Sequence, residues 1–166
     1  AYVLEQYTPH GLDQSNYHNV ILGGLGGSGI GAQIVKSWLY DKVSKPIEVV
    51  HDYHLPSYAN EGTLVILNSY SGNTEETLQM YSEAKAAGCK IICMASGGQL
   101  KEKAETDGLK FYSIPQGFQP RMTIGHGFSY LYMILGEFFG LDIRAELEEV
   151  RDQFPQEREK QKNSAE

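Results

Sequence analysis

Three hydroxyl-bearing residues lie close together in one short segment, and their spacing is suited to binding a phosphate group. Ser69, Ser71 and Thr74 fall within six residues, and Gly72 allows the chain to turn between them. A segment of helical composition follows, so free N–H groups and the positive end of a helix dipole are expected beside the hydroxyls. Hydroxyls and amides arranged in this way can hold a phosphate dianion without any lysine.

The same segment also permits a purely structural interpretation. Ser or Thr followed three residues later by Glu is the pattern of an N-terminal capping box. In that arrangement Asn73 or Thr74 would cap the helix, and Glu76 or Thr77 would return the hydrogen bond. Capping uses one hydroxyl and leaves two without a role, so we favour phosphate binding.

A glycine-rich segment precedes this loop in the chain. Six of the nine residues from Gly23 to Gly31 are glycine, which lets the backbone approach a ligand and point amide groups at it. The alternative role is a turn that only permits tight packing of a strand against a helix. The spacing G-x-G-x-x-G at Gly24, Gly26 and Gly29, with Asp52 closing the next strand, also makes an NAD-binding domain a rival interpretation.

Short apolar runs alternate with helical patterns around these segments, and this alternation is typical of a parallel α/β sheet. We therefore predict an α/β fold, a three-layer doubly wound sandwich of flavodoxin type with five parallel strands. In such a sheet, ligands bind beyond the carboxyl ends of the strands, where both unusual segments would lie. The predicted strands are Asn19–Leu22, Ile47–Val50, Thr63–Leu67, Lys90–Met94 and Phe111–Ile114, and the predicted helices are 28–40, 77–87 and 122–139.

The composition limits the class of protein. The chain has 166 residues, 41% of them hydrophobic, so it can bury a core as one domain. Its 14 basic and 21 acidic residues give a net charge of −7, which argues against a nucleic-acid or anionic-membrane binder. No apolar run approaches the roughly 20 residues that span a membrane. Cys89 and Cys93 have the spacing of neither a disulfide-closed loop nor a metal cage, so we expect a reduced, cytoplasmic setting and no metal.

Two further segments have open interpretations. The predicted helix over residues 122–139 is apolar around more than one side, so we expect it to lie mainly in the core, with part of its surface meeting a partner domain or subunit. Residues 144–166 are dominated by charged side chains. We predict a domain over residues 1–143, followed by a charged tail that is either a solvated, fraying helix or a linker to another domain.

Three motifs together resemble one known family. GGSGIG at Gly26–Gly31, SYSGNTEET at Ser69–Thr77 and PQGFQPR at Pro115–Arg121 are similar to the sugar isomerase (SIS) domain. The pattern S-x-S-G-x-T alone is common to that superfamily, which includes transcriptional regulators. The combination resembles the N-terminal half of bifunctional phosphoglucose/phosphomannose isomerases, over roughly Asn19 to Phe139.

The resemblance implies roles for individual residues. The hydroxyls of Ser69, Ser71 and Thr74 would hold the substrate phosphate, while Gly27 and Ser28 would contact the sugar.

The resemblance also implies a catalytic role for Arg121, whose planar cation would lie near the C1 and C2 oxygens and stabilise an enediolate. The alternative for Arg121 is a surface ion pair. The catalytic acid and base would come from a second SIS domain or a neighbouring subunit, because no histidine here matches a family acid/base motif. For His126, the histidine nearest to Arg121 in the chain, we favour packing over catalysis.

We therefore expect the sugar-phosphate-binding domain of an aldose-ketose isomerase that interconverts glucose 6-phosphate or mannose 6-phosphate with fructose 6-phosphate. Its expected partners are a hexose 6-phosphate, a second SIS domain and a second copy in a homodimer, and no cofactor is expected. The rival functions are a non-catalytic sugar-phosphate sensing module and, less favoured, an NAD-binding domain.

Overall fold

The five strands form one parallel sheet, as predicted. The structure is a computed structural model that describes residues 1–163, without the side chains of residues 120 and 154–163. The order β2-β1-β3-β4-β5 is that of a flavodoxin-like doubly wound sheet. The bounds of the strands are β1 Asn19–Gly23, β2 Ile47–Val50, β3 Thr63–Asn68, β4 Lys90–Ala95 and β5 Lys110–Ser113.

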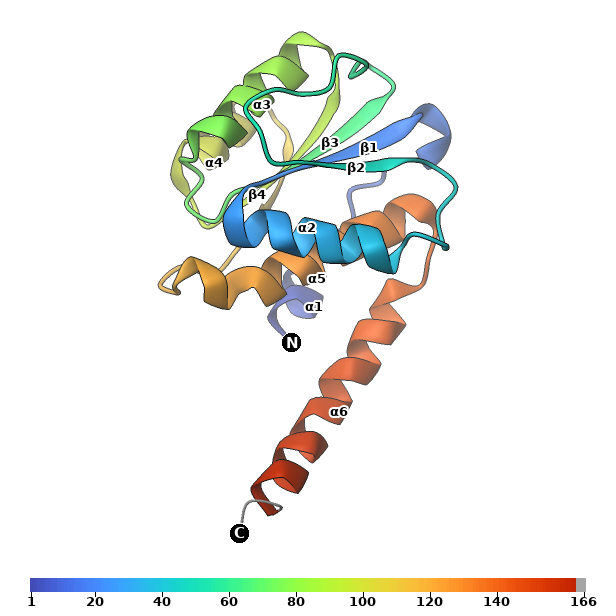
Figure 1. The fold of residues 1–166 in the computed structure, drawn as a ribbon, viewed down its shortest axis with the longest axis vertical. Helices are drawn as coiled ribbons and strands as arrows, with labels where there is room; N and C mark the ends of the chain where they lie inside the picture. The colour runs from blue at the N-terminus through green and yellow to red at the C-terminus, as the bar shows by residue number, and fades with distance from the viewer. Residues whose placement is uncertain (164–166) are drawn as a thin grey trace.

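Helices cover both faces of the sheet and make the predicted three layers (Figure 1). Helices α3 (Glu75–Ala86) and α4 (Gly98–Thr106) pack on one face. The other face carries α1 (Tyr2–Gln6), α2 (Gly26–Trp38) and α5 (Ile124–Phe139). Two short 3-10 turns complete the chain before α5, η1 at Gln14–Asn16 and η2 at Pro120–Thr123.

The central strand β3 shows why the sheet has two cores. All six of its residues are buried, and successive side chains point to opposite faces. Leu64 and Ile66 pack in the cluster with α2 and α5, whereas Val65 and Leu67 pack in the cluster with α3 and α4. A continuous apolar run is what a strand covered on both faces requires.

The exposed apolar side chains of the helices lie mainly on α2, and α5 is mostly buried. Most apolar side chains of α5 are buried in the core, as predicted, among them Tyr130, Tyr132, Met133, Leu135, Phe138 and Phe139. Ile124 and Phe128 are half-buried, and the contact of this segment with a partner domain or subunit stays a prediction. The exposed apolar stripe lies on α2, where Ile30, Ile34 and Trp38 are 53%, 45% and 57% exposed. The apolar residues of α2 serve two sides of the helix, which a single periodic pattern does not reveal.

The C-terminal segment is a helix, α6 (Ile143–Asn163), which points away from the body of the domain (Figure 1). Ile143 is buried in the main core, so the helix begins inside the domain and continues out of it. The prediction of a tail or linker over 144–166 stays a prediction, and its last three residues lie outside the described part. Within residues 1–163, no helix combines the length and apolar character needed to cross a membrane.

Candidate functional site

The hydroxyl-rich segment connects β3 to α3 and is folded on itself. The hydroxyls of Ser69 and Thr74 are 2.8 Å apart and share a hydrogen bond. The Ser69 hydroxyl also accepts a hydrogen bond from the N–H of Gly72 (3.2 Å). The Ser71 hydroxyl accepts one from the N–H of Asn73 (3.2 Å). The three hydroxyls expected to bind phosphate are therefore brought into one tight turn at the start of α3.

The capping-box interpretation of this segment is wrong. Thr74 occupies the N-cap position of α3, but no side chain makes a capping hydrogen bond there. The Thr74 hydroxyl is instead directed to Ser69. The first N–H groups of a helix have no partner within the helix, so those of α3 remain available to an anion beside the hydroxyls.

The loop after β4 braces this turn from the side. The carbonyl of Gly72 accepts a hydrogen bond from the N–H of Leu100 (2.9 Å), and the side-chain oxygen of Asn73 accepts one from the N–H of Gln99 (3.0 Å). Gly72 has φ +69°, and an added Cβ would overlap the carbonyl oxygen of Gly97. The loop after β4 is therefore a structural support for the hydroxyl-rich turn.

Most of the glycine-rich segment belongs to α2, and only Gly24 and Leu25 lie between β1 and this helix. The sequence prediction started this helix at Ser28, but α2 begins at Gly26, so Gly27 and Ser28 lie in its first turn. Gly29 faces the imidazole of His51, whose Nδ1 is 2.9 Å from the carbonyl oxygen of Gly24. An added Cβ on Gly29 would overlap that ring, which gives this glycine a packing reason of its own.

The strand ends place three helix starts at one edge of the sheet. Helices α2, α3 and α4 follow the parallel strands β1, β3 and β4, so the positive ends of their dipoles converge there. This arrangement supplies positive potential in a chain whose net charge is −7. It suits an anionic group held by backbone amides and hydroxyls.

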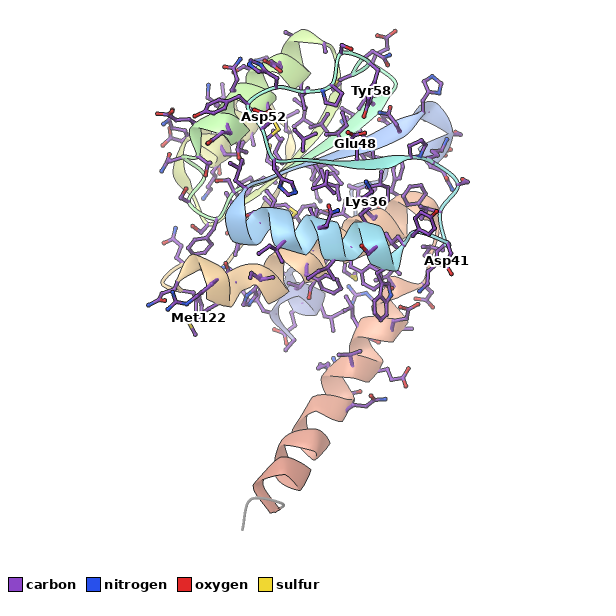
Figure 2. All side chains as sticks on the ribbon, in the orientation of Figure 1. Lys36, Asp41, Glu48, Asp52, Tyr58 and Met122 are labelled. Carbon is purple, nitrogen blue, oxygen red and sulfur yellow. The ribbon has the colours of Figure 1, made fainter. Side chains whose placement is uncertain are left out.

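The loop after β5 contacts the residues that follow β3 and β4. The Tyr70 hydroxyl accepts a hydrogen bond from the N–H of Phe118 (3.0 Å), and Gln116 donates one to the carbonyl of Ser96 (2.7 Å). Arg121 is exposed in η2, and no ion pair is seen for it among the described residues. Its neighbour Met122 lies at the end of the molecule where α2 begins (Figure 2), in keeping with the contact between η2 and α2.

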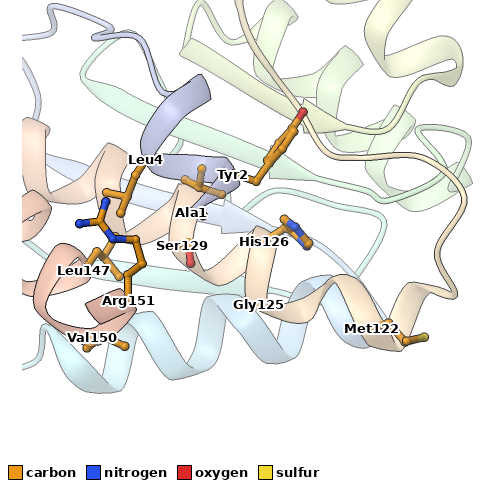
Figure 3. Close-up of a pocket in the computed structure, with 11 residues that line it drawn as sticks. Ala1, Tyr2, Leu4, Met122, Gly125, His126, Ser129, Leu147, Val150 and Arg151 are labelled. Atoms are coloured by element: carbon orange, nitrogen blue, oxygen red, sulfur yellow. The ribbon is translucent and has the colours of Figure 1, made fainter. Parts of the chain in front are cut away.

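His126 lies in the first turn of α5. It lines a pocket of about 320 Å³ between α1, α5 and α6, together with Tyr2, Leu147 and Arg151 (Figure 3). Its ring lies 5.7 Å from that of Tyr2 and 6.1 Å from that of Phe118, centroid to centroid. These contacts favour the packing role over a catalytic one.

Burial lowers the pKa of His126 below its ordinary value of 6.5, with a smaller contribution from the N-terminal amine. The unfolded chain therefore binds this proton more tightly, so the folded state loses stability as the pH falls below about 6.5. The variant His126→Phe keeps an aromatic ring and lacks the proton site. We expect its free energy of unfolding, measured with urea at pH 7.5 and pH 5, to fall less on acidification than that of the wild type. Parallel losses would contradict this account.

The dinucleotide interpretation gains no support from Asp52. Its carboxylate accepts a hydrogen bond from the adjacent N–H of Tyr53 (2.6 Å), and the residue is exposed on the loop after β2.

Among the described residues no group of three histidine, cysteine or acidic side chains is placed to hold a metal ion. Both cysteines are free, and burial raises the pKa of the Cys93 thiol to about 12, so its thiol stays protonated.

A family model of the SIS domain matches residues 15–106, which is more than half of the chain. The chain belongs to the SIS domain family. The matched region holds the first four strands, α2, α3 and the hydroxyl-rich turn. The expected resemblance is thereby confirmed, and with it the fold.

Curated relatives of this SIS domain are sugar-phosphate enzymes. A bifunctional phosphoglucose/phosphomannose isomerase of Caldicellulosiruptor bescii is 40% identical and covers 99% of this chain and 51% of its own. One from Aquifex aeolicus is 42% identical over 75% of this chain and 39% of its own. A D-glucosamine-6-phosphate 4-epimerase of Sulfolobus acidocaldarius is 37% identical over 79% of this chain and 42% of its own. The chain therefore spans about half the length of the first relative and less of the others.

Solved structures agree on the fold. The C-terminal domain of a glucosamine-fructose-6-phosphate aminotransferase from Francisella tularensis has a TM-score of 0.65 at 14% identity, over 84% of this chain and 44% of its own. A phosphoheptose isomerase from the same organism has a TM-score of 0.59 at 16% identity, over 76% of this chain and 78% of its own. At such low identity these similarities establish the architecture alone.

Proposed function

We propose that this SIS domain binds a hexose 6-phosphate at the carboxyl ends of its strands. In this proposal Ser69, Ser71 and Thr74, with the uncapped start of α3, hold the phosphate. The observation that carries the proposal is the tight turn before α3, which holds all three hydroxyls, pairs those of Ser69 and Thr74, and leaves the helix start without a side-chain cap. Gly27 and Ser28, in the first turn of α2, contact the sugar.

We also propose that the intact protein is an aldose-ketose isomerase acting on glucose 6-phosphate, mannose 6-phosphate and fructose 6-phosphate. The support is the 40% identity with a bifunctional phosphoglucose/phosphomannose isomerase over almost the whole chain. Isomerisation removes a proton from one of the two carbons C1 and C2 and returns it to the other through an enediolate. The exposed guanidinium of Arg121 would stabilise the negative oxygen of that intermediate.

The proton carriers belong, in this proposal, to a second SIS domain or a second copy in a homodimer. The relatives support a larger protein, because this chain spans about half of the first one. The exposed stripe of Ile30, Ile34 and Trp38 on α2 supports burial of this helix against another domain. The charged residues 144–166 would then form the connection, as a continuation of α6.

A thermal-shift titration of this chain tests the binding proposal. A ligand that binds only the folded state adds about 2.7 kcal/mol to the free energy of unfolding at a hundredfold excess over Kd. For a domain of this size, that gain raises the melting temperature by roughly 5 to 10 °C. We expect a rise with glucose 6-phosphate and fructose 6-phosphate, a smaller rise with inorganic phosphate and none with NAD. A rise with NAD alone would overturn the proposal. Rapid turnover of fructose 6-phosphate by this chain by itself would overturn the assignment of the proton carriers.

A second candidate function is a sugar-phosphate epimerase. The observation that favours it is the 37% identity with the D-glucosamine-6-phosphate 4-epimerase over 79% of this chain. Glucosamine 6-phosphate in the same titration separates the two: a rise in melting temperature that exceeds that with fructose 6-phosphate favours the epimerase.

A further inference from the structure

Asn68 is a buried polar residue at the carboxyl end of β3, directly before the hydroxyl-rich turn. It is 3% exposed. Since side chains alternate along a strand, Asn68 points to the same face as Ile66, toward α2 and α5. Ser69 points the other way, toward α3. Asn68 is the last residue of β3, one residue beyond the predicted end of this strand at Leu67.

The amide of Asn68 is incompletely bonded. Its Oδ1 atom is buried and has no hydrogen-bond partner among the described residues. Its Nδ2 atom faces Gly127 of α5, where an added Cβ would come within 3.0 Å. Buried polar atoms in proteins are normally paired, so an unpaired carbonyl oxygen at the edge of a binding site needs an explanation. An apolar residue of similar size would suit this position better if only packing mattered.

Asn68 lines a small recess between the first turns of α2 and α5. The volume of the recess is about 10 Å³, which is close to the space that one water oxygen requires. The residues around it come from the glycine-rich segment, the end of β3 and the start of α5, and include Gly27, Ser28, Asn68, Tyr70, Thr123 and Gly127. Two of these, Gly27 and Ser28, are the residues assigned to the sugar.

The chemistry of the recess distinguishes the two ends of a sugar phosphate. A carbonyl oxygen accepts hydrogen bonds and cannot donate them. A phosphate dianion has only acceptor oxygens, so it cannot satisfy Oδ1 of Asn68. A sugar hydroxyl can donate to it, and one hydroxyl oxygen matches the size of the recess.

We propose that Asn68 is a positioning residue whose Oδ1 accepts a hydrogen bond from one hydroxyl of the bound sugar phosphate. This inference rests on the proposed function and adds to it a residue that recognises the sugar and not the phosphate. Asn68 thereby sets the orientation of the sugar chain between Ser28 and the start of α5, while the hydroxyl-rich turn on the other side of β3 anchors the phosphate.

Isothermal titration of the variant Asn68→Leu with fructose 6-phosphate and with inorganic phosphate tests this role. We expect the affinity for fructose 6-phosphate to fall about tenfold, as one net hydrogen bond predicts, and the affinity for inorganic phosphate to stay unchanged. The midpoint of urea unfolding should stay equal or rise, because an unpaired buried polar atom has been removed. Asn68→Ala, which introduces no bulk, should show the same selective loss.

The matched control is Asn19→Leu, the same substitution at the opposite edge of the sheet. Oδ1 of Asn19 accepts a hydrogen bond from the Thr63 hydroxyl (3.0 Å), so this variant should lose stability and keep both affinities. If Asn68→Leu and Asn68→Ala lose affinity equally for the two ligands, or for neither, the role of Asn68 is overturned and the proposed function still stands. A wild-type chain that binds neither ligand would overturn the proposed function, and this inference with it.

Discussion

Removing the hydroxyls of Ser71 and Thr74 together is expected to weaken binding of fructose 6-phosphate by roughly 2 to 5 kcal/mol, which is about 30-fold to 4,000-fold in Kd. Hydrogen bonds to a charged phosphate are stronger than those between neutral groups, and no lysine is assigned to this turn that would take over the charge. Inorganic phosphate should lose affinity to a similar extent, because both ligands use the same anchor. Isothermal titration of the double variant Ser71→Ala/Thr74→Ala measures both.

The control for this double variant is Ser82→Ala on the exposed side of α3. The Ser82 hydroxyl donates only to the carbonyl of Leu78, four residues earlier in the same helix. We expect the affinity of Ser82→Ala for both ligands to equal that of the wild type. Unchanged affinity in the double variant would mean that the turn is only a support for α3.

Replacing Gly72 by alanine is expected to lower the free energy of unfolding by about 3 kcal/mol or more. Two effects combine at this position. The φ of +69° is unfavourable for a residue with a Cβ, and the Cβ itself would overlap the carbonyl oxygen of Gly97. Relief of the overlap requires the hydroxyl-rich turn and the start of α4 to separate, so affinity for fructose 6-phosphate should fall as well. Urea unfolding and the same titration measure the two losses.

Gly108→Ala separates the two effects. Gly108 has nearly the same φ, +64°, but an added Cβ would meet nothing within 4 Å. This variant should lose only the conformational part, about 1 kcal/mol, and keep its affinity for the sugar phosphate. If both variants lose the same free energy of unfolding, the overlap of the added Cβ with Gly97 does not contribute to the destabilisation of Gly72→Ala.

The hydrophobic pattern predicted the sheet well. Each of the five strands was placed within one residue at each end, because short apolar runs bounded by glycine and polar residues are a local property of the chain. The helices were less accurate. α1 was missed, since five residues are too few to reveal a period. α2 begins two residues earlier than predicted, because the glycines at Gly26 and Gly27 read as a loop although the backbone there is helical.

The spacing of hydroxyls and glycines in the sequence indicated where a binding site is expected, because such clusters of these residue types are unusual. Only the tertiary structure showed that the Thr74 hydroxyl makes no capping hydrogen bond, since its partner, Ser69, lies across a turn. Only the tertiary structure gave Asn68 a candidate role, since its surroundings come from α2 and α5, which are distant in the chain. Periodicity and composition act over neighbouring residues, whereas the partner of a side chain is fixed by how parallel strands and their crossover helices bring separate loops to one edge.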